Sequence, residues 1–169
     1  MISYLRPISI FILCMVSWCC LNPFAPKLEN ESVGNSCNDL TLIENVFCTF
    51  KSAYAFKDTT MYGAIIAPDF TFIYRDYDRN VDVTWGRFEE MKTTHALFQT
   101  AQSLSLTWNN EISSSETETT YTSIRGFNLV VSFNPSDLVF IDGFANLTFE
   151  RDSSTANWKI IRWRDESNF

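Results

Sequence analysis

One histidine and a few aromatic side chains are the residues of this sequence that could do chemistry. His95 is the only histidine, and an imidazole titrates near neutral pH, so it could act as a general base or proton shuttle. The alternative is a core or rim histidine that is satisfied by one hydrogen bond. We favour this alternative because the sequence places no partner group beside it. His95 is therefore the single candidate catalytic residue.

A second candidate site consists of aromatic residues spread along the chain. Large rings with a few polar tips could line an apolar pocket that suits a lipidic or aromatic ligand. The simpler alternative is that the rings only fill a core, since aromatic residues make up 15% of the chain. The candidate pocket residues are Tyr54, Tyr74, Trp85 and Trp163.

The sequence gives little support for a metal site, a cofactor site or nucleic-acid binding. Asp76, Asp78 and Asp82 alternate in a turn, but the glycine and terminal glutamate of a calcium loop are missing, so we expect a solvated acidic turn and no metal. The sequence contains no glycine-rich phosphate loop, HExxH or CxxC motif, and we expect no cofactor. The formal net charge of −7 opposes binding to a phosphate backbone, so nucleic acid is excluded as a partner.

Three helices are expected in the first part of the chain. Thr41 and Glu44 have capping-box spacing at the start of a helix that runs to about Phe56. Thr59–Ile66 fits a short helix that stops before Pro68. A third helix is predicted over roughly Arg87–Ala101. Its predicted apolar stripe consists of Phe88, Met91, His95 and Phe98.

Strands are expected around and after these helices. Phe70–Tyr74 reads as a strand, and from Ser103 the pattern alternates. Asn109–Thr120 is rich in Ser, Thr and Glu and is predicted to be a hairpin loop. Long strands then follow over 121–133, 138–150 and 158–165. This order predicts an α+β fold in which about five antiparallel strands form a curved sheet over three helices.

The closing hairpin has apolar residues on both faces. Alternation places Val139, Ile141, Ala145, Leu147 and Phe149 on one face, which the helices would cover. Leu138, Phe140 and Phe144 lie on the other. We expect that outer face to meet a partner, which could be a second copy of the chain.

The N-terminus indicates export. Arg6 precedes an uncharged apolar run, Ile8–Trp18, that is short for a membrane span. The run ends at Cys19 and Cys20, and Val16–Cys20 resembles the bacterial lipobox, in which a cysteine is lipidated. The resemblance implies a signal peptide over 1–19, a tether over 20–39, a domain over 40–169, and anchoring in the cell envelope facing the periplasm. A cleaved signal or an uncleaved anchor are the alternatives.

Two further cysteines follow the leader. In an oxidising compartment Cys37 and Cys48 could form a disulfide that staples the tether to the first helix. Alternatively, Cys48 is a small buried hydrophobe and Cys37 a free thiol. Spacing alone does not decide between the two.

The order of elements resembles the nuclear transport factor 2-like superfamily, which includes ketosteroid isomerases and polyketide cyclases. The residues that carry the resemblance are the Lys57-Asp58 break, Ala67-Pro68-Asp69-Phe70 entering the first strand, and Trp158–Trp163 in the last strand. The similarity covers about Leu40 to Asn168. It implies a cone in which a curved sheet wraps a long helix and leaves a pocket at the wide end.

The catalytic pattern of the ketosteroid isomerases is missing. Counted without gaps from Asp69, its donor tyrosine and its basic aspartate correspond to Phe50 and Tyr74. Phe50 has no hydroxyl for an oxyanion, and tyrosine, with a pKa of about 10, is a poor base at neutral pH.

These observations favour a non-catalytic, envelope-tethered domain that binds a small hydrophobic ligand or a protein partner. The alternatives are a His95-dependent isomerase or dehydratase acting on a hydrophobic substrate, and a scaffold that dimerises through the outer face of the sheet.

Overall fold

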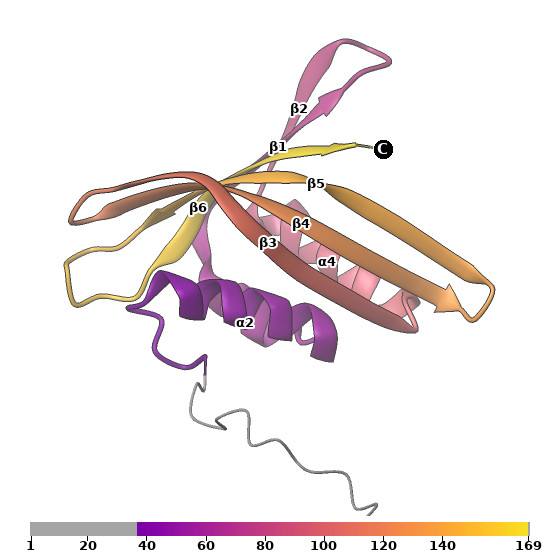
Figure 1. Cartoon of the computed structure of the whole chain (residues 1–169), viewed down its shortest axis with the longest axis horizontal. Helices are drawn as coiled ribbons and strands as arrows, with labels where there is room; N and C mark the ends of the chain where they lie inside the picture. The colour runs from indigo at the N-terminus through magenta and orange to yellow at the C-terminus, as the bar shows by residue number, and fades with distance from the viewer. Residues whose placement is uncertain (1–36, 169) are drawn as a thin grey trace, which may run out of the picture. The chain divides into compact units, whose positions relative to one another are not determined.

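Strands in which apolar and polar residues alternate form a sheet that curves over three helices (Figure 1). Most of this sheet comes from the second half of the chain. The computed structural model describes residues 37–168, so the predicted signal peptide, most of the tether, Cys19 and Cys20 lie outside the described residues. The elements in chain order are α2 (Ile43–Phe56), α3 (Thr59–Ile65), β1 (Ile66–Asp76), β2 (Val81–Gly86), α4 (Arg87–Thr100), β3 (Ser103–Glu116), β4 (Thr120–Asn134), β5 (Asp137–Glu150) and β6 (Lys159–Asn168).

The six strands of the described region form one sheet in the order β2-β1-β6-β5-β4-β3. Neighbouring strands are antiparallel except β1 and β6, which run parallel. The helices lie on one side of this sheet, and Figure 1 shows α2 and α4 beneath its concave face. This arrangement confirms the predicted α+β fold, with β2 as a strand that sequence reasoning did not count.

The sheet faces follow the alternation of the sequence. On β5, the odd-numbered residues Ala145, Leu147 and Phe149 are fully buried against the helices. Pairing carries the same parity onto β4, because residues directly opposite each other point to the same face. On β6 it holds at Trp163 and Asp165, and a register shift then brings Ile160 opposite Phe149 on the inner face. Leu138, Phe140 and Phe144 therefore lie on the outer face, as predicted.

A phenylalanine on α2 connects the helices with the sheet. Phe50 is 1% exposed, and its ring lies 5.2 Å from that of Tyr62 on α3 and 5.3 Å from that of Trp108 on β3. Trp163 on β6 packs edge-on against it at 5.5 Å. The narrow part of the cone is thus filled with rings, as the high aromatic content predicted.

The predicted capping box at the first helix is wrong. The N-cap of α2 is Leu42, which makes no side-chain cap hydrogen bond. The amide and hydroxyl of Thr41 instead donate to the Asp39 carboxylate at 3.1 and 2.6 Å. The carboxylate of Glu44 pairs with Arg125 on β4 at 3.2 Å, a tertiary contact that replaces the local one.

The predicted loop over Asn109–Thr120 is also mostly wrong. Residues up to Glu116 continue β3, and β4 begins at Thr120. Ile112–Thr119 are exposed on both sides, so this end of the hairpin needs no apolar alternation. Backbone pairing with β4 and hydrogen bonds to Glu111 from Tyr121 (2.7 Å) and Ser123 (2.5 Å) hold it in place.

A third difference concerns the face that α4 buries. Its buried residues are Glu90, Thr94 and Phe98, whereas Phe88, from the predicted stripe, is 76% exposed. The helix is rotated because Glu90 and Thr94 take part in an internal hydrogen-bond network described below.

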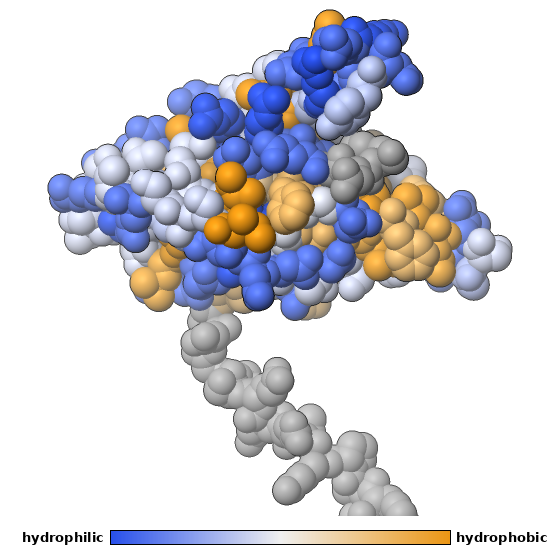
Figure 2. Space-filling view, turned by 45° about the horizontal axis from the view of Figure 1, so that its top comes forward, coloured by the Kyte–Doolittle hydropathy of each residue, from blue (hydrophilic) through white to orange (hydrophobic). Residues whose placement is uncertain are grey.

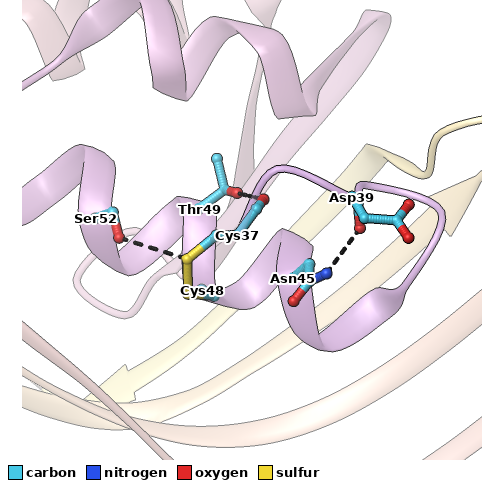
Figure 3. Close-up of a disulfide and its surroundings, with 6 residues drawn as sticks. All are labelled: Cys37, Asp39, Asn45, Cys48, Thr49 and Ser52. Atoms are coloured by element: carbon cyan, nitrogen blue, oxygen red, sulfur yellow. Dashed lines mark hydrogen bonds between the residues drawn. A yellow bond between two sulfur atoms is a disulfide. The ribbon is translucent and has the colours of Figure 1, made fainter. Parts of the chain in front are cut away.

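A disulfide joins Cys37 to Cys48 (Figure 3), with the two Cα atoms 5.6 Å apart. The Thr49 hydroxyl also donates to the backbone carbonyl of Cys37 at 2.9 Å. The segment that precedes α2 is thereby held against the helix, which is the first of the two arrangements considered for these cysteines. Within residues 37–168, no helix has the length and apolar character needed to cross a membrane.

Candidate functional site

A cavity of about 150 Å³ lies between α4 and the inner face of the sheet. Two threonines and three aliphatic residues form part of its wall: Thr93, Thr94, Leu97, Leu129 and Ile141. Its aromatic walls come from α2, β1, β2, β4 and β6 and consist of Tyr54, Phe72, Trp85, Phe127 and Trp163. Two acidic residues, Glu90 and Asp165, complete the lining. We call this cavity the cone pocket.

Two larger hollows lie elsewhere on the described surface, with volumes of about 540 and 340 Å³. The first lies over Asn109, Asn128 and Asp142, and the second beside Asp69 and Lys159. All five of these side chains are exposed. Neither hollow contains a buried ionisable group, so the smaller cone pocket is the better candidate site.

The defining residue of the cone pocket is Glu90 on α4. Its carboxylate is buried, with the residue 4% exposed. The Tyr62 hydroxyl donates to Oε1 at 2.7 Å and the Trp85 indole N–H donates to Oε2 at 2.7 Å. A third bond comes from the Thr94 hydroxyl to Oε1 at 3.1 Å. Three donors directed at two oxygens are what an ionised carboxylate requires when it leaves water.

These bonds come from three different elements. Tyr62 belongs to α3, Trp85 to β2, and Thr94 to the same helix as Glu90. The network therefore fixes the orientation of α4 against the start of the sheet. It also fixes the Trp85 ring, which stacks on Phe72 with ring centroids 4.4 Å apart and an angle of 14° between the planes.

Burial and nearby acidic groups act on the two phenols in and beside the cone pocket. Burial raises the pKa of Tyr54 far above its ordinary value, and the charges of Glu90 and Asp165 raise it further. Burial likewise raises the pKa of Tyr62, again with a contribution from Glu90. Both phenols therefore remain neutral donors at physiological pH.

Three of the four predicted pocket residues line the cone pocket, namely Tyr54, Trp85 and Trp163. Tyr74 does not; its ring lies outside, 5.4 Å from that of Trp85. His95 is exposed, and its Nδ1 lies 3.4 Å from the Thr59 hydroxyl. Since His95 is not part of the pocket lining, a catalytic role for it stays a prediction, as does ligand binding by the aromatic residues.

Glu90, Thr94 and Asp165 were missed in the sequence. Glu90, Thr94 and Phe98 recur at intervals of four, so they share one helical face. That spacing was the available signal in the sequence. A helical face that carries a glutamate and a threonine is, however, ordinarily predicted to be exposed to solvent. Only the contacts with Tyr62 and Trp85 show that this face turns inward.

Solved structures share this architecture. A conserved protein from Planctomyces limnophilus aligns with a TM-score of 0.65 at 14% identity, covering 75% of this chain and 93% of the other. A protein from Novosphingobium aromaticivorans, provisionally named a scytalone dehydratase, gives 0.64 at 15% identity, with 75% and 82% covered.

A third structure, from Streptomyces avermitilis, gives 0.59 at 14% identity, with 75% and 94% covered; it is provisionally named a dehydratase of the nuclear transport factor 2-like family. No protein-family model and no curated protein matches the sequence. At these identities the likeness concerns the fold, and the described residues have the nuclear transport factor 2-like cone fold that the sequence order indicated.

The buried phenols predict how stability depends on alkaline pH. The pKa of Tyr54 and Tyr62 is higher in the folded protein than the value of about 10 expected after unfolding. The folded state thus keeps protons that the unfolded state releases. We expect the contribution of these two phenols to the free energy of unfolding to be constant below about pH 9 and to fall as pH rises through 10 and above, as measured by urea denaturation.

The matched variants are Tyr54→Phe, which should flatten this alkaline decline, and Tyr77→Phe, at a side chain that is 78% exposed and should leave the decline unchanged. Ultraviolet titration of the folded protein that showed Tyr54 and Tyr62 ionising like free tyrosine would contradict the described burial.

Proposed function

We propose that this protein binds a small, largely apolar ligand in the cone pocket and does not transform it. The observation that carries the proposal is an aromatic cavity of about 150 Å³ with a buried, oriented carboxylate in its wall. An apolar cavity of that size holds a molecule of roughly one ring. The five aromatic rings would contact the apolar part of the ligand, and the Glu90 carboxylate would orient a polar group of the ligand.

The absence of the isomerase pattern supports a binding role. Phe50 is a core residue at 1% exposure, and Tyr74 lies outside the cone pocket. The main alternative is a His95-dependent isomerase or dehydratase. Two structural neighbours carry provisional dehydratase names. His95 does not line this pocket, and the pocket's ionisable residues are Tyr54, Glu90 and Asp165. Because the pKa of Tyr54 is raised, a proton acceptor in this pocket would have to be a carboxylate.

Filling the cone pocket tests the binding role. Benzyl alcohol, which has one ring and one hydrogen-bond donor, should give saturable signals in ligand-observed NMR with the wild-type protein. Leu97→Trp places a large ring in the cavity and should weaken binding at least tenfold, because the apolar contact area is then taken by the protein itself.

Leu138→Trp, on the outer face of the sheet, is the matched control and should bind like the wild type. Equal binding by all three proteins would place the ligand elsewhere and refute the proposal.

We further propose that the domain is exported and anchored in the cell envelope through Cys19 or Cys20. The support is the sequence pattern alone, since these residues lie outside the described region. Metabolic labelling with a fatty acid should mark the wild-type protein, and a Cys19→Ala, Cys20→Ala double variant should lose the label because both proposed lipidation sites are gone. Persistent label in that variant would contradict the anchor.

A dimeric scaffold is the third candidate, favoured by apolar exposure on the outer face. Leu138, Phe140 and Phe144 are 47, 70 and 42% exposed, and Figure 2 shows an apolar area near the end of the sheet where β4 turns into β5. Such a patch on a soluble surface is typical of an interaction site.

If a second copy covers this face, Phe140→Asp should weaken dimerisation at least tenfold in sedimentation equilibrium, because it buries an unpaired charge at the interface. Phe88→Asp, at an equally exposed phenylalanine on α4, is the control and should not change the dimer. A wild-type protein that is monomeric at high micromolar concentration would exclude the scaffold.

A further inference from the structure

We infer that the hollow of about 540 Å³ on the outer face of the sheet binds a neutral oligosaccharide. We call it the outer hollow. It is separate from the cone pocket, so the inference does not depend on the proposed function. The lining of the outer hollow includes Asn109 and Ile112 on β3, Gly126 and Asn128 on β4, and Asp142 and Phe144 on β5.

Three planar polar side chains form a row across neighbouring strands. Asn128 lies directly opposite Asp142, so both side chains point to the same face of the sheet, which is the outer one. On the other side, Asn128 Nδ2 donates to Asn109 Oδ1 at 3.2 Å and orients both amides. Within residues 37–168, Asp142 and the remaining groups of these amides have no protein partner. They can therefore donate to and accept from a ligand.

A β-bulge and a glycine bring this row close to an aromatic ring. The register between β3 and β4 shifts after Trp108, so Asn109 and Asn110 lie in a bulge, a feature that redirects side chains. A Cβ on Gly126 would lie 3.3 Å from that of Asn109 and 3.7 Å from the ring of Phe144. Because Gly126 has no side chain, the amide and the ring approach each other across it.

This combination matches the surface of a sugar. A pyranose carries adjacent hydroxyls, each a donor and an acceptor, which pair with amide and carboxylate groups. It also has a face of weakly positive C–H groups that packs on the negative face of an aromatic ring. Phe144 is 42% exposed and Ile112 is 64% exposed, so apolar surface is available beside the polar row. Recognition of this kind requires no buried ionisable group.

The charge of the lining favours a neutral sugar over other polar ligands. Asp142 is the one ionisable residue among the described residues that line the outer hollow, so a phosphate or an acidic glycan would meet a negative charge without a cation to offset it. A single carboxylate with a few amides also suits a divalent cation poorly, since such an ion takes about six or more oxygen ligands.

The size of the outer hollow indicates more than one sugar unit. A closed cavity of about 150 Å³ holds one six-membered ring, and the outer hollow has a volume of about 540 Å³. It therefore has room for about three rings. A trisaccharide is the matching probe.

Saturation-transfer NMR with three neutral trisaccharides tests the inference on the full domain. Cellotriose, maltotriose and triacetylchitotriose are titrated separately, and at least one should bind with a Kd of about 1 mM or lower. The acidic trisaccharide 3′-sialyllactose should bind at least about tenfold more weakly than the best of them, because its carboxylate would approach Asp142.

Two pairs of variants on β5 locate the site. Phe144→Ala and Asp142→Ala should each weaken binding of the best trisaccharide at least about fivefold, since one removes the ring and the other the carboxylate. Phe140→Ala and Asp137→Ala are the matched controls, because both residues are exposed on the same strand and neither lines the outer hollow. Both controls should bind like the wild type.

Two further variants separate this site from the other candidates. Leu97→Trp, which fills the cone pocket, should leave trisaccharide binding unchanged. A second copy on the outer face would cover Phe144, so the titration is repeated with Phe140→Asp, which should bind the sugar at least as tightly as the wild type.

Binding of none of the neutral trisaccharides to the wild type and to Phe140→Asp would overturn the inference. Binding that is unchanged in both Phe144→Ala and Asp142→Ala, or lost in Leu97→Trp, would place the sugar elsewhere. Equal binding of 3′-sialyllactose would refute the preference for a neutral glycan. None of these results bears on benzyl alcohol in the cone pocket, so the proposed function is tested independently.

Discussion

The structure depends on the burial of one carboxylate, that of Glu90, beside an apolar core rich in aromatic rings. Bringing Glu90 out of water costs several kcal/mol unless donors replace the lost hydration. Tyr62, Trp85 and Thr94 supply those donors. Because they come from α3, β2 and α4, satisfying one charge also sets how these elements meet. The same bonds turn α4 so that a polar face looks inward, and leave its Phe88 in water.

The hydrogen bonds of Glu90 link the fold to the proposed binding role. If the inner wall were entirely apolar, we would expect its side chains to pack closely and fill the cavity, because protein interiors reach a high packing density. Here the carboxylates of Glu90 and Asp165 face a cavity between Trp85 and Trp163. Aromatic surface and a buried, hydrogen-bonded carboxylate therefore occur together at one place, and this combination distinguishes the cone pocket from the larger, exposed hollows.

Much of the fold could be predicted because its pattern is local. Alternation in β5 assigns both faces of the sheet correctly, since successive residues in a strand point to opposite sides. The bounds of α3 and α4 fall within one residue of the prediction. Local patterns failed where a distant contact decides the outcome. Glu44 pairs with Arg125 instead of capping its helix, and the polar stretch after Asn109 becomes a strand because β4 pairs with it.

The aromatic residues that line the candidate site could be predicted from the sequence, whereas its acidic residues could not. Tyr54, Trp85 and Trp163 could be chosen because large rings seek burial, whereas Glu90 is recognised only through Tyr62, 28 residues away. His95 was predicted as part of an apolar stripe, but only Phe98 of that stripe is fully buried, and His95 is exposed. The most direct test of a ligand site in the cone pocket is to follow the indole N–H signals of Trp85 and Trp163 by NMR during titration with benzyl alcohol. Saturable shifts of these two signals, abolished by Leu97→Trp, are predicted; unchanged signals at both residues would contradict a ligand site in the cone pocket.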